Sequence, residues 1–259
     1  MGNREQTLTL LQELMQTGLV WGVKAEFEAE GTRTHEFAEL VSIAKEARAK
    51  VAVKIGGPEA VRDLLEVEPL GVDVVIAPMC ESGYAVEKFA GAVKKVFGKS
   101  QSQPKFLVNF ETVNTWKSRE EVVKAAAARD EVDGIVFGRV DYSLSSGLGR
   151  EAINDNQVLE AVRWVAANCH RTRLELVVGG GVSPLALPFL RKVQEDGLTR
   201  FETRKVVFHA NSLQSDDLSA ALQLASRWEV QLLELKRSRN VGISREDDAR
   251  IAMLRERWL

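Results

Sequence analysis

Two acidic residues stand at the ends of apolar segments and could bind a cation. Glu111 ends the segment Phe106 to Glu111, and Asp141 ends the segment Gly134 to Asp141. Neighbouring strands of a sheet lie about 4.8 Å apart, so the two carboxylates can share one Mg²⁺ or Mn²⁺ and leave its other positions to water and substrate oxygens. The alternative is that both acids cap the following loops or pair with Arg139.

Three charged residues alternate along the segment Val20 to Glu28. Lys24, Glu26 and Glu28 occupy every second position, so in a strand their side chains share one face, which we expect to point into the mouth of a barrel. There Lys24 and Glu26 are candidates for substrate binding, and Glu28 is a candidate catalytic group. The alternative is a buried ladder of ion pairs with lysines on adjacent strands, which needs no substrate.

Lys54 lies near the end of the segment Val51 to Ile55 and has the parity of Ala52, so it also faces inward. It is the expected partner of these acids and a candidate catalytic group. A protonated lysine stabilises a developing enolate oxygen, whereas a neutral, desolvated one forms a Schiff base with a carbonyl substrate. Lys205 poses the same choice, and we expect it to belong to a structural charge network.

The histidines and a glycine run give weaker indications. His209 follows the last predicted strand, and we expect it to reach the mouth as a candidate catalytic group. Gly179 to Gly181 stand between a strand and a helix start, where bare amides bind a carboxylate or phosphate, although such a run is also a common tight turn. The sequence has no cysteine–histidine cluster typical of zinc sites and no nucleophile-elbow serine.

These residues need a scaffold that brings strand ends together. Short apolar segments alternate with segments of helical period, which is typical of strand–helix units around a parallel sheet. The predicted strands are Val20 to Glu28, Val51 to Ile55, Val72 to Pro78, Phe106 to Glu111, Gly134 to Asp141, Leu174 to Gly179, and Phe201 to Phe208. We predict a closed α/β barrel of the (β/α)8 TIM type over an open doubly wound sheet, with an eighth strand near the N-terminus.

Composition sets the remaining bounds. A chain of 259 residues with 45% hydrophobic content fits one barrel domain over residues 1–259, in which 237–259 forms a C-terminal helical extension. That extension packs on its own barrel or docks on another subunit of a homo-oligomer. The 35 basic residues balance 37 acidic ones, so we expect neither nucleic-acid nor membrane partners. Two cysteines and the lack of an apolar signal segment favour a cytoplasmic protein.

Three motifs in the centre of the chain resemble those of the HpcH/HpaI aldolase and citrate lyase family. They are Val75-Ile-Ala-Pro-Met-Cys-Glu-Ser82, Asn109-Phe-Glu-Thr112, and Gly138-Arg-Val-Asp-Tyr-Ser143 with Gly147-Leu-Gly149. Their order and spacing agree with the family pattern. The resemblance implies a barrel that binds an enolising 2-oxo acid at a divalent metal, with Glu111 and Asp141 as metal ligands. It also implies that the segment Gly138, Arg139 and Val140 binds substrate, with the amides of Val140 and Asp141 on its carboxylate.

Two positions depart from the family pattern. Lys54 stands where the family has an arginine, and a lysine supplies the charge without the two-pronged contact. The family's histidine base falls near Ala29, so Glu28, Arg33, His209 or a metal-bound water is expected to act instead. We also consider Arg33 a substrate-binding residue.

The resulting hypothesis is a class II, divalent-metal-dependent aldolase or lyase. It makes or cleaves a carbon–carbon bond next to an enolised, pyruvate-like 2-oxo acid, with an aldehyde or related electrophile as second substrate. Three alternatives stay open: a lyase or condensing enzyme that uses phosphoenolpyruvate or an acyl thioester, a Schiff-base enzyme, and a barrel that binds a metabolite without catalysis.

Overall fold

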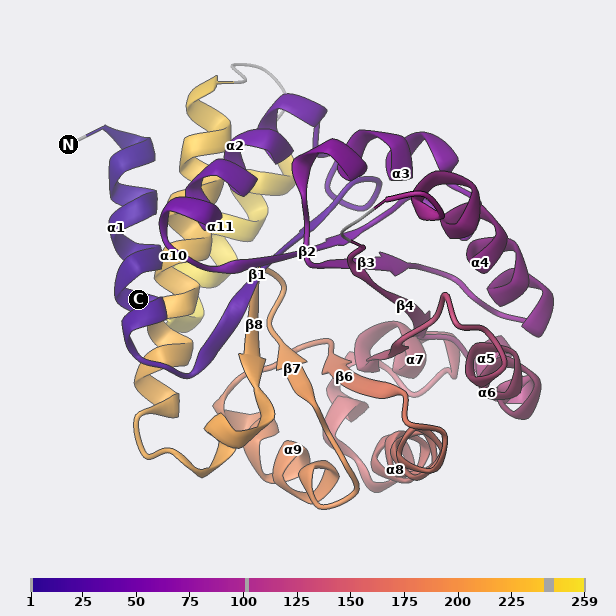
Figure 1. The fold of residues 1–259 in the computed structure, drawn as a ribbon. Helices are drawn as coiled ribbons and strands as arrows, with labels where there is room; N and C mark the ends of the chain where they lie inside the picture. The colour runs from indigo at the N-terminus through magenta and orange to yellow at the C-terminus, as the bar shows by residue number, and fades with distance from the viewer. Residues whose placement is uncertain (1, 101–102, 240–244, 259) are drawn as a thin grey trace.

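Alternating strands and helices close into an eight-stranded barrel in the computed structural model, which describes residues 2–100, 103–239 and 245–258 (Figure 1). The strands are β1 (Val20–Glu26), β2 (Lys50–Lys54), β3 (Val74–Ala77), β4 (Lys105–Phe110), β5 (Gly134–Gly138), β6 (Glu175–Gly179), β7 (Arg200–Glu202) and β8 (Val206–His209). They follow one another around the barrel in chain order. The predicted α/β barrel is therefore confirmed.

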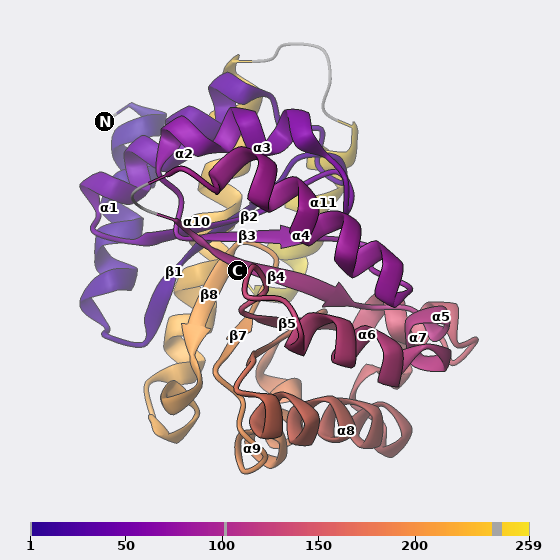
Figure 2. The same cartoon turned by 45° about the vertical axis from the view of Figure 1, so that its right-hand side comes forward.

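Helices surround the barrel on its outer side (Figures 1 and 2). They are α1 (Asn3–Gln16), α2 (Thr34–Glu46), α3 (Val61–Val67), α4 (Gly83–Phe97), α5 (Val113–Lys117), α6 (Arg119–Ala127), α7 (Arg139–Ser145), α8 (Asn156–Thr172), α9 (Leu187–Gln194), α10 (Leu218–Arg239) and α11 (Arg245–Trp258). Short 3₁₀ helices are η1 (Glu68–Leu70), η2 (Arg150–Asn154), η3 (Pro184–Ala186) and η4 (Ala210–Gln214). No helix within the described ranges is long and apolar enough to cross a membrane.

The last strand runs opposite to the others. β1 to β7 are parallel, but β8 pairs antiparallel with both β7 and β1. The expected single strand over Phe201 to Phe208 is split by a tight turn, in which the Thr203 amide donates to the Val206 carbonyl and the Val206 amide donates to Thr203 Oγ1. The eighth strand is thus part of this hairpin, and its expected position near the N-terminus was wrong. Because β8 is reversed, His209 lies at the end of the barrel where β1 to β7 begin.

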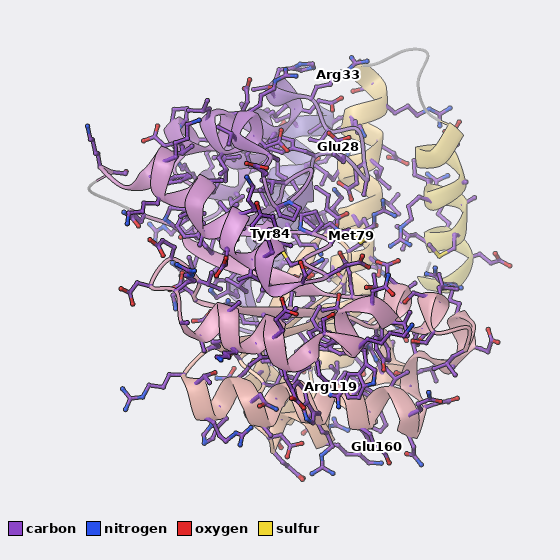
Figure 3. All side chains as sticks on the ribbon, turned by 90° about the vertical axis from the view of Figure 1, so that its right-hand side faces the viewer. Glu28, Arg33, Met79, Tyr84, Arg119 and Glu160 are labelled. Carbon is purple, nitrogen blue, oxygen red and sulfur yellow. The ribbon has the colours of Figure 1, made fainter. Side chains whose placement is uncertain are left out.

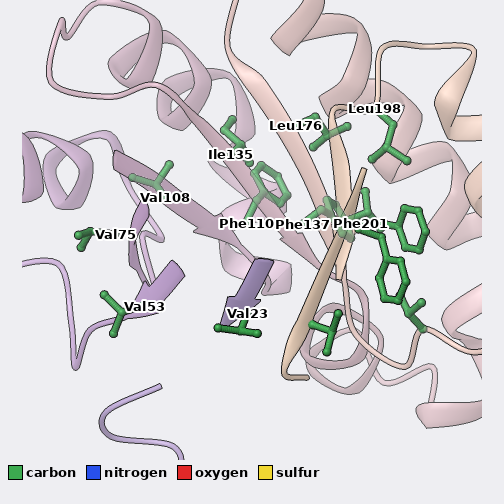
Figure 4. Packing of buried hydrophobic residues seen from close by; sticks show 14 of the residues in the cluster. Val23, Val53, Val75, Val108, Phe110, Ile135, Phe137, Leu176, Leu198 and Phe201 are labelled. Atoms are coloured by element: carbon green, nitrogen blue, oxygen red, sulfur yellow. The ribbon is translucent and has the colours of Figure 1, made fainter. Parts of the chain in front are cut away.

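Two apolar layers hold the barrel together. Inward-facing residues from alternating strand positions, among them Ile76, Leu107 and Val136, fill the interior. Outward-facing residues such as Val108 and Ile135 pack against the helices, as Figure 4 shows. Since inward positions recur every second residue, the polar side chains that follow this inner layer gather above it, at the C-terminal ends of the parallel strands.

The two C-terminal helices pack against different partners. α10 lies along α1, and Trp228 Nε1 donates a hydrogen bond to the Thr7 carbonyl at 3.1 Å (Figure 1). α11 packs on α10 through a separate apolar cluster that includes Leu233 and Leu254. Residues 237–239 of the expected extension belong to α10, and 240–244 and 259 lie outside the described residues. α11 therefore contacts its own chain, one of the two arrangements left open by the sequence.

Candidate active site

Glu111 follows β4 directly, and its side chain is buried, with the residue only 2% exposed. Its Oε1 accepts a hydrogen bond from the Met79 amide at 3.0 Å, and its Oε2 accepts one from Asn109 Nδ2 at 2.7 Å. Gly138 on β5 faces the same carboxylate, because a side-chain carbon built at Gly138 would lie 2.9 Å from Glu111 Cβ. The ends of β3, β4 and β5 thus enclose one carboxylate.

The backbone at Met79 is bent to reach this carboxylate. Met79 has a φ of 53°, a left-handed conformation that an ordinary side chain adopts at a cost of about 1–3 kcal/mol and that is most common at functional sites. The bend directs its amide to Glu111, while its side chain stays 53% exposed on the C-terminal face of the barrel (Figure 3). The strained residue therefore contributes a backbone donor to the site.

Glu111 differs from the other buried acids in its lack of a positive partner. Four glutamates are buried in the described part of the chain. Three of them pair with lysine or arginine: Glu26 with Lys24 and Lys54, Glu202 with Lys24, and Glu229 with Arg250. Within the same residues Glu111 contacts only neutral N–H donors. Buried charges are normally paired or bound to a metal, so this carboxylate is suited to a cation.

Asn109 adds a second unpaired oxygen. Its Nδ2 donates to Glu111, but its Oδ1 is buried and has no hydrogen-bond partner among the described residues. Such an orphan acceptor costs about 1–3 kcal/mol unless a ligand or water supplies the missing contact. Asn109 was not among the site residues predicted from the sequence. A signal was present, since an amide interrupts the apolar segment two residues before Glu111 and so faces the same way.

Asp141 is not at a strand end as expected. β5 stops at Gly138, and residues from Arg139 onward form α7, so Asp141 lies in the first turn of that helix and is exposed. Its carboxylate makes no ion pair with any of the described residues. β5 ends at Gly138, which is paired with Gly179, the last residue of β6, and α7 begins at the next residue. Asp141 stays a candidate ligand from the next loop of the same barrel face.

Arg139 does not reach a substrate, which corrects its predicted role. The residue is fully buried, and its guanidinium donates to the carbonyls of Gly179 and Gly180 at 3.1 and 2.7 Å and to Asn154 Oδ1 at 2.7 Å. It also stacks 4.8 Å above the Phe189 ring. Burial lowers the pKa of Arg139 to about 10. Since all its donors serve carbonyl and amide oxygens, its role is to fasten the turn after β6 to α7.

The glycine run after β6 acts as a tight turn. Gly180 has a φ of 83°, and a side-chain carbon built there would lie 2.7 Å from the Val140 nitrogen. Only glycine fits this close approach. Of the two roles considered for Gly179 to Gly181, packing of the turn against α7 is the one that these contacts support.

Lys24 and Glu26 form the core of an ion-pair ladder inside the barrel. Lys24 Nζ pairs with Glu202 and lies 3.3 Å from Glu26, and Lys54 Nζ lies 3.4 Å from the other oxygen of Glu26. Burial alone would raise the pKa of Glu26, but the two ammonium groups hold it at about 2. Burial disfavours the charge of Lys24, yet Glu202 and Glu26 raise its pKa overall. The predicted substrate contacts of Lys24 and Glu26 are therefore replaced by contacts with each other.

A second ion-pair group lies beside the ladder. Lys205 and Arg204, in the turn between β7 and β8, both pair with Glu30 of the loop after β1. Burial would raise the pKa of Glu30, but Lys205 lowers it overall. This agrees with the structural role expected for Lys205. Glu30 was not selected from the sequence, because the loop after β1 gives no periodic signal.

Glu28 and Arg33 lie on the C-terminal face of the barrel, in the loop after β1 and at the start of α2 (Figure 3). Both are exposed. Glu28 packs against Gly56 after β2, since a side-chain carbon built at Gly56 would lie 3.1 Å from Glu28 Oε1. Together with Lys54, which ends β2, Glu28 therefore borders the mouth of the barrel.

His209 is at the wrong end of the barrel for catalysis at this mouth. Because β8 runs antiparallel to β7, the backbone of His209 lies opposite that of Arg200, the first residue of β7. Burial and the nearby charge of Arg200 lower the pKa of His209. The expectation that His209 reaches the mouth was wrong, since a parallel last strand was assumed.

The atoms near Glu111 that could bind a metal fit a hard divalent cation. They are oxygens, which Mg²⁺ and Mn²⁺ prefer, and one carboxylate and one amide oxygen have unused capacity. No group of three or more histidine, cysteine, aspartate or glutamate residues in the described ranges is arranged to bind a metal. A cation here would accordingly depend on water or substrate oxygens besides the protein.

Comparison with known proteins places the fold. No protein family model and no curated protein sequence matches the chain. Similar solved structures include an HpcH/HpaI aldolase from Desulfitobacterium hafniense DCB-2, with 15% identity and a TM-score of 0.56 over 70% of this chain and 76% of that chain. The citrate synthase SbnG has 17% identity and a TM-score of 0.62 over 85% and 89%. An HpcH/HpaI aldolase/citrate lyase family protein from Burkholderia cenocepacia J2315 has 16% identity and a TM-score of 0.60 over 90% and 91%. The chain shares the barrel fold of these proteins.

Proposed function

We propose that this chain is a divergent member of the HpcH/HpaI aldolase and citrate lyase family and acts as a metal-dependent carbon–carbon lyase on a pyruvate-like 2-oxo acid. The observation that carries the proposal is Glu111, a buried carboxylate at the C-terminal end of a barrel strand whose charge no described lysine or arginine balances. In barrels of this type that end bears the active site.

Glu111 and Asp141 would hold Mg²⁺ or Mn²⁺, with Asn109 Oδ1 as a further oxygen on the same side. When bound, the cation would polarise the 2-oxo group of the substrate and so acidify the adjacent carbon. The two hydrogen bonds from Met79 and Asn109 fix the Glu111 carboxylate. This preorganisation keeps its orientation without a salt bridge that would compete with the cation.

Lys54 would supply positive charge to the enolate oxygen. Its ammonium group is held at the mouth by Glu26, and Glu26 is in turn held by Lys24. Because its ammonium group is paired with the Glu26 carboxylate, we assign Lys54 an electrostatic role and not that of a Schiff-base nucleophile. The ladder below the mouth thus has a use in the proposed reaction although Lys24 and Glu26 do not touch the substrate.

Glu28 is the proposed general base. It is an exposed carboxylate on the same face as Lys54, whereas His209 lies at the other end of the barrel. In the cleavage direction Glu28 would take the proton from the hydroxyl group of the aldol adduct, and in the synthetic direction it would return that proton to the aldehyde oxygen. With pyruvate alone, the same carboxylate would take a proton from the methyl group, and the enolate carbon would then receive a deuteron that solvent has supplied to Glu28. The amides of Val140 and Asp141 would bind the substrate carboxylate.

The test is exchange of the pyruvate methyl protons into deuterium oxide, followed by proton NMR with and without Mn²⁺. The wild-type chain is expected to catalyse exchange only with the metal. Glu111→Gln and Asp141→Asn should lower the rate at least 100-fold, a typical loss for one group that stabilises transition-state charge. Glu160→Gln and Asp130→Asn, at exposed positions outside the mouth, are the matched controls. Exchange that is equally fast in Glu111→Gln would refute the proposal.

A further inference from the structure

A cavity of about 690 Å³ lies apart from Glu111, between α2, α10, α11 and the turn that joins β7 to β8. Its apolar wall consists of Leu40 and Ile43 from α2, Leu232 and Leu235 from α10, and Met253 from α11. The volume is within the range of about 300–1,000 Å³ in which proteins bind small molecules. None of the residues assigned to the proposed reaction lines it.

The charged side chains around this cavity carry a positive excess. Six basic and four acidic residues line it. The buried acids are already neutralised, because Glu30 pairs with Arg204 and Lys205, and Glu229 pairs with Arg250 at 2.9 Å. These pairs hold the walls together. The other two acids of the lining belong to α2: Glu36 accepts a hydrogen bond from the Arg33 amide, and Glu39 lies 4.0 Å from Arg4, which is outside the lining.

Two arginines of the cavity have no partner in the described part of the chain. Arg150 belongs to η2, beside the mouth of the barrel, and Arg257 belongs to the last turn of α11. They come from segments that are 107 residues apart in sequence yet line one space. A guanidinium group is well suited to bind a carboxylate through two hydrogen bonds.

We infer that this cavity is a binding site for an amphipathic carboxylate, in which Arg150 and Arg257 bind the carboxylate and an aliphatic tail lies along Leu232 and Met253. α11 otherwise contacts α10, through an apolar cluster and through ion pairs such as Arg250–Glu229 and Arg255–Glu234. A ligand in the cavity would therefore connect α11 to α2 and the barrel. The site is independent of the proposed lyase reaction and of its metal.

The test is titration calorimetry with decanoate, a ten-carbon carboxylate, on the full chain. We expect one decanoate per chain, and at least tenfold weaker binding of decanamide, which lacks the charge, and of butyrate, which lacks the tail. The double variant Arg150→Gln/Arg257→Gln should weaken decanoate binding at least tenfold. The matched control is Arg255→Gln, because Arg255 is on the same helix but pairs with Glu234 and does not line the cavity.

A second variant tests the tail position separately. Leu232→Trp adds volume to the apolar wall and should reduce decanoate binding at least tenfold while the unfolding temperature stays within a few degrees of wild type. If this variant is unstable, Ala249→Trp on the exposed face of α11 fills the same cavity. The inference is overturned if decanoate does not bind, if decanamide binds equally well, or if the double arginine variant binds decanoate like wild type.

Discussion

Lys54 Nζ lies 3.4 Å from Glu26 Oε2, so the last residues of β1 and β2 are joined by an ion pair at the mouth of the barrel. Glu26 is also 3.3 Å from Lys24, whose ammonium group reaches on to Glu202 of β7. The four charges alternate in sign across three strands. Because each charge has an opposite neighbour, the ladder can be buried without neutralising any of its groups.

The first prediction concerns Glu26→Gln and pH. The pKa of Glu26 is about 2 in the folded chain and 4.5 without these contacts, so its stabilising contribution is present above pH 4.5 and disappears as the pH falls towards 2. This pKa difference corresponds to about 3 kcal/mol. Urea unfolding should show the variant less stable than wild type by about this amount at pH 7, with the difference shrinking below pH 4.5. Glu160→Gln, at an exposed position, should show no such pH dependence.

The second prediction concerns the effect of Mn²⁺ on stability at Glu111. A ligand that binds only the folded chain at 100 times its dissociation constant stabilises it by about 2.7 kcal/mol. Mn²⁺ should therefore raise the melting temperature of wild type and leave that of Glu111→Gln unchanged. Differential scanning calorimetry measures both, and Glu160→Gln should keep the full shift. An equal shift in Glu111→Gln would mean that the cation binds elsewhere, whatever the enzymatic activity.

The third prediction compares two glycines. Gly180→Ala places a side chain at a φ of 83° and 2.7 Å from the Val140 nitrogen, so it should cost at least about 2 kcal/mol. Gly91→Ala in α4 meets open space at a helical position and should stabilise the chain by about 0.5–1 kcal/mol. Chemical unfolding of both variants tests the packing of the β6 turn against α7. A neutral Gly180→Ala would show that this turn is not tightly packed.

Most of the barrel could be predicted from the sequence, because the spacing of apolar residues and the length of each apolar segment are local properties of the chain. The strands around Val53, Val108 and Val136 were found within a few residues of their observed bounds. The hairpin of β7 and β8 was not found, since an apolar segment carries no sign of strand direction. A turn of three polar residues, Thr203 to Lys205, was its only signal and was read as part of a strand.

The site was predicted unevenly for related physical reasons. Side chains two residues apart in a strand face the same side, and this rule predicts that Glu111 faces the barrel interior. The same rule places Lys54 and Glu26 on the inner side of two adjacent strands, where they pair. The roles of Arg139 and Asn109 depend on contacts with residues far away in sequence or on an atom that lacks a contact, and neither leaves a periodic pattern. His209 was misplaced because its position depends on the direction of β8.

The last prediction distinguishes the two acid–base candidates, Glu28 and His209. Glu28 borders the mouth near Lys54. His209 lies opposite Arg200 in the register of β7 and β8, at the other end of the barrel. Glu28→Gln should therefore lower the rate of metal-dependent pyruvate exchange by about 10²–10⁴-fold, the usual contribution of a general base. His209→Gln should keep the exchange rate within twofold.

His209 should also affect how the stability of the folded chain depends on pH. Its pKa is lowered by burial and by Arg200, so charging it opposes folding and stability should fall as the pH drops below 6.5. His209→Gln should remove part of that fall without changing exchange at neutral pH. Should His209→Gln abolish exchange while Glu28→Gln leaves it intact, the assignment of the mouth at the ends of β1 to β7 would be wrong, because no base at the β8 terminus can reach a substrate bound beside Glu111.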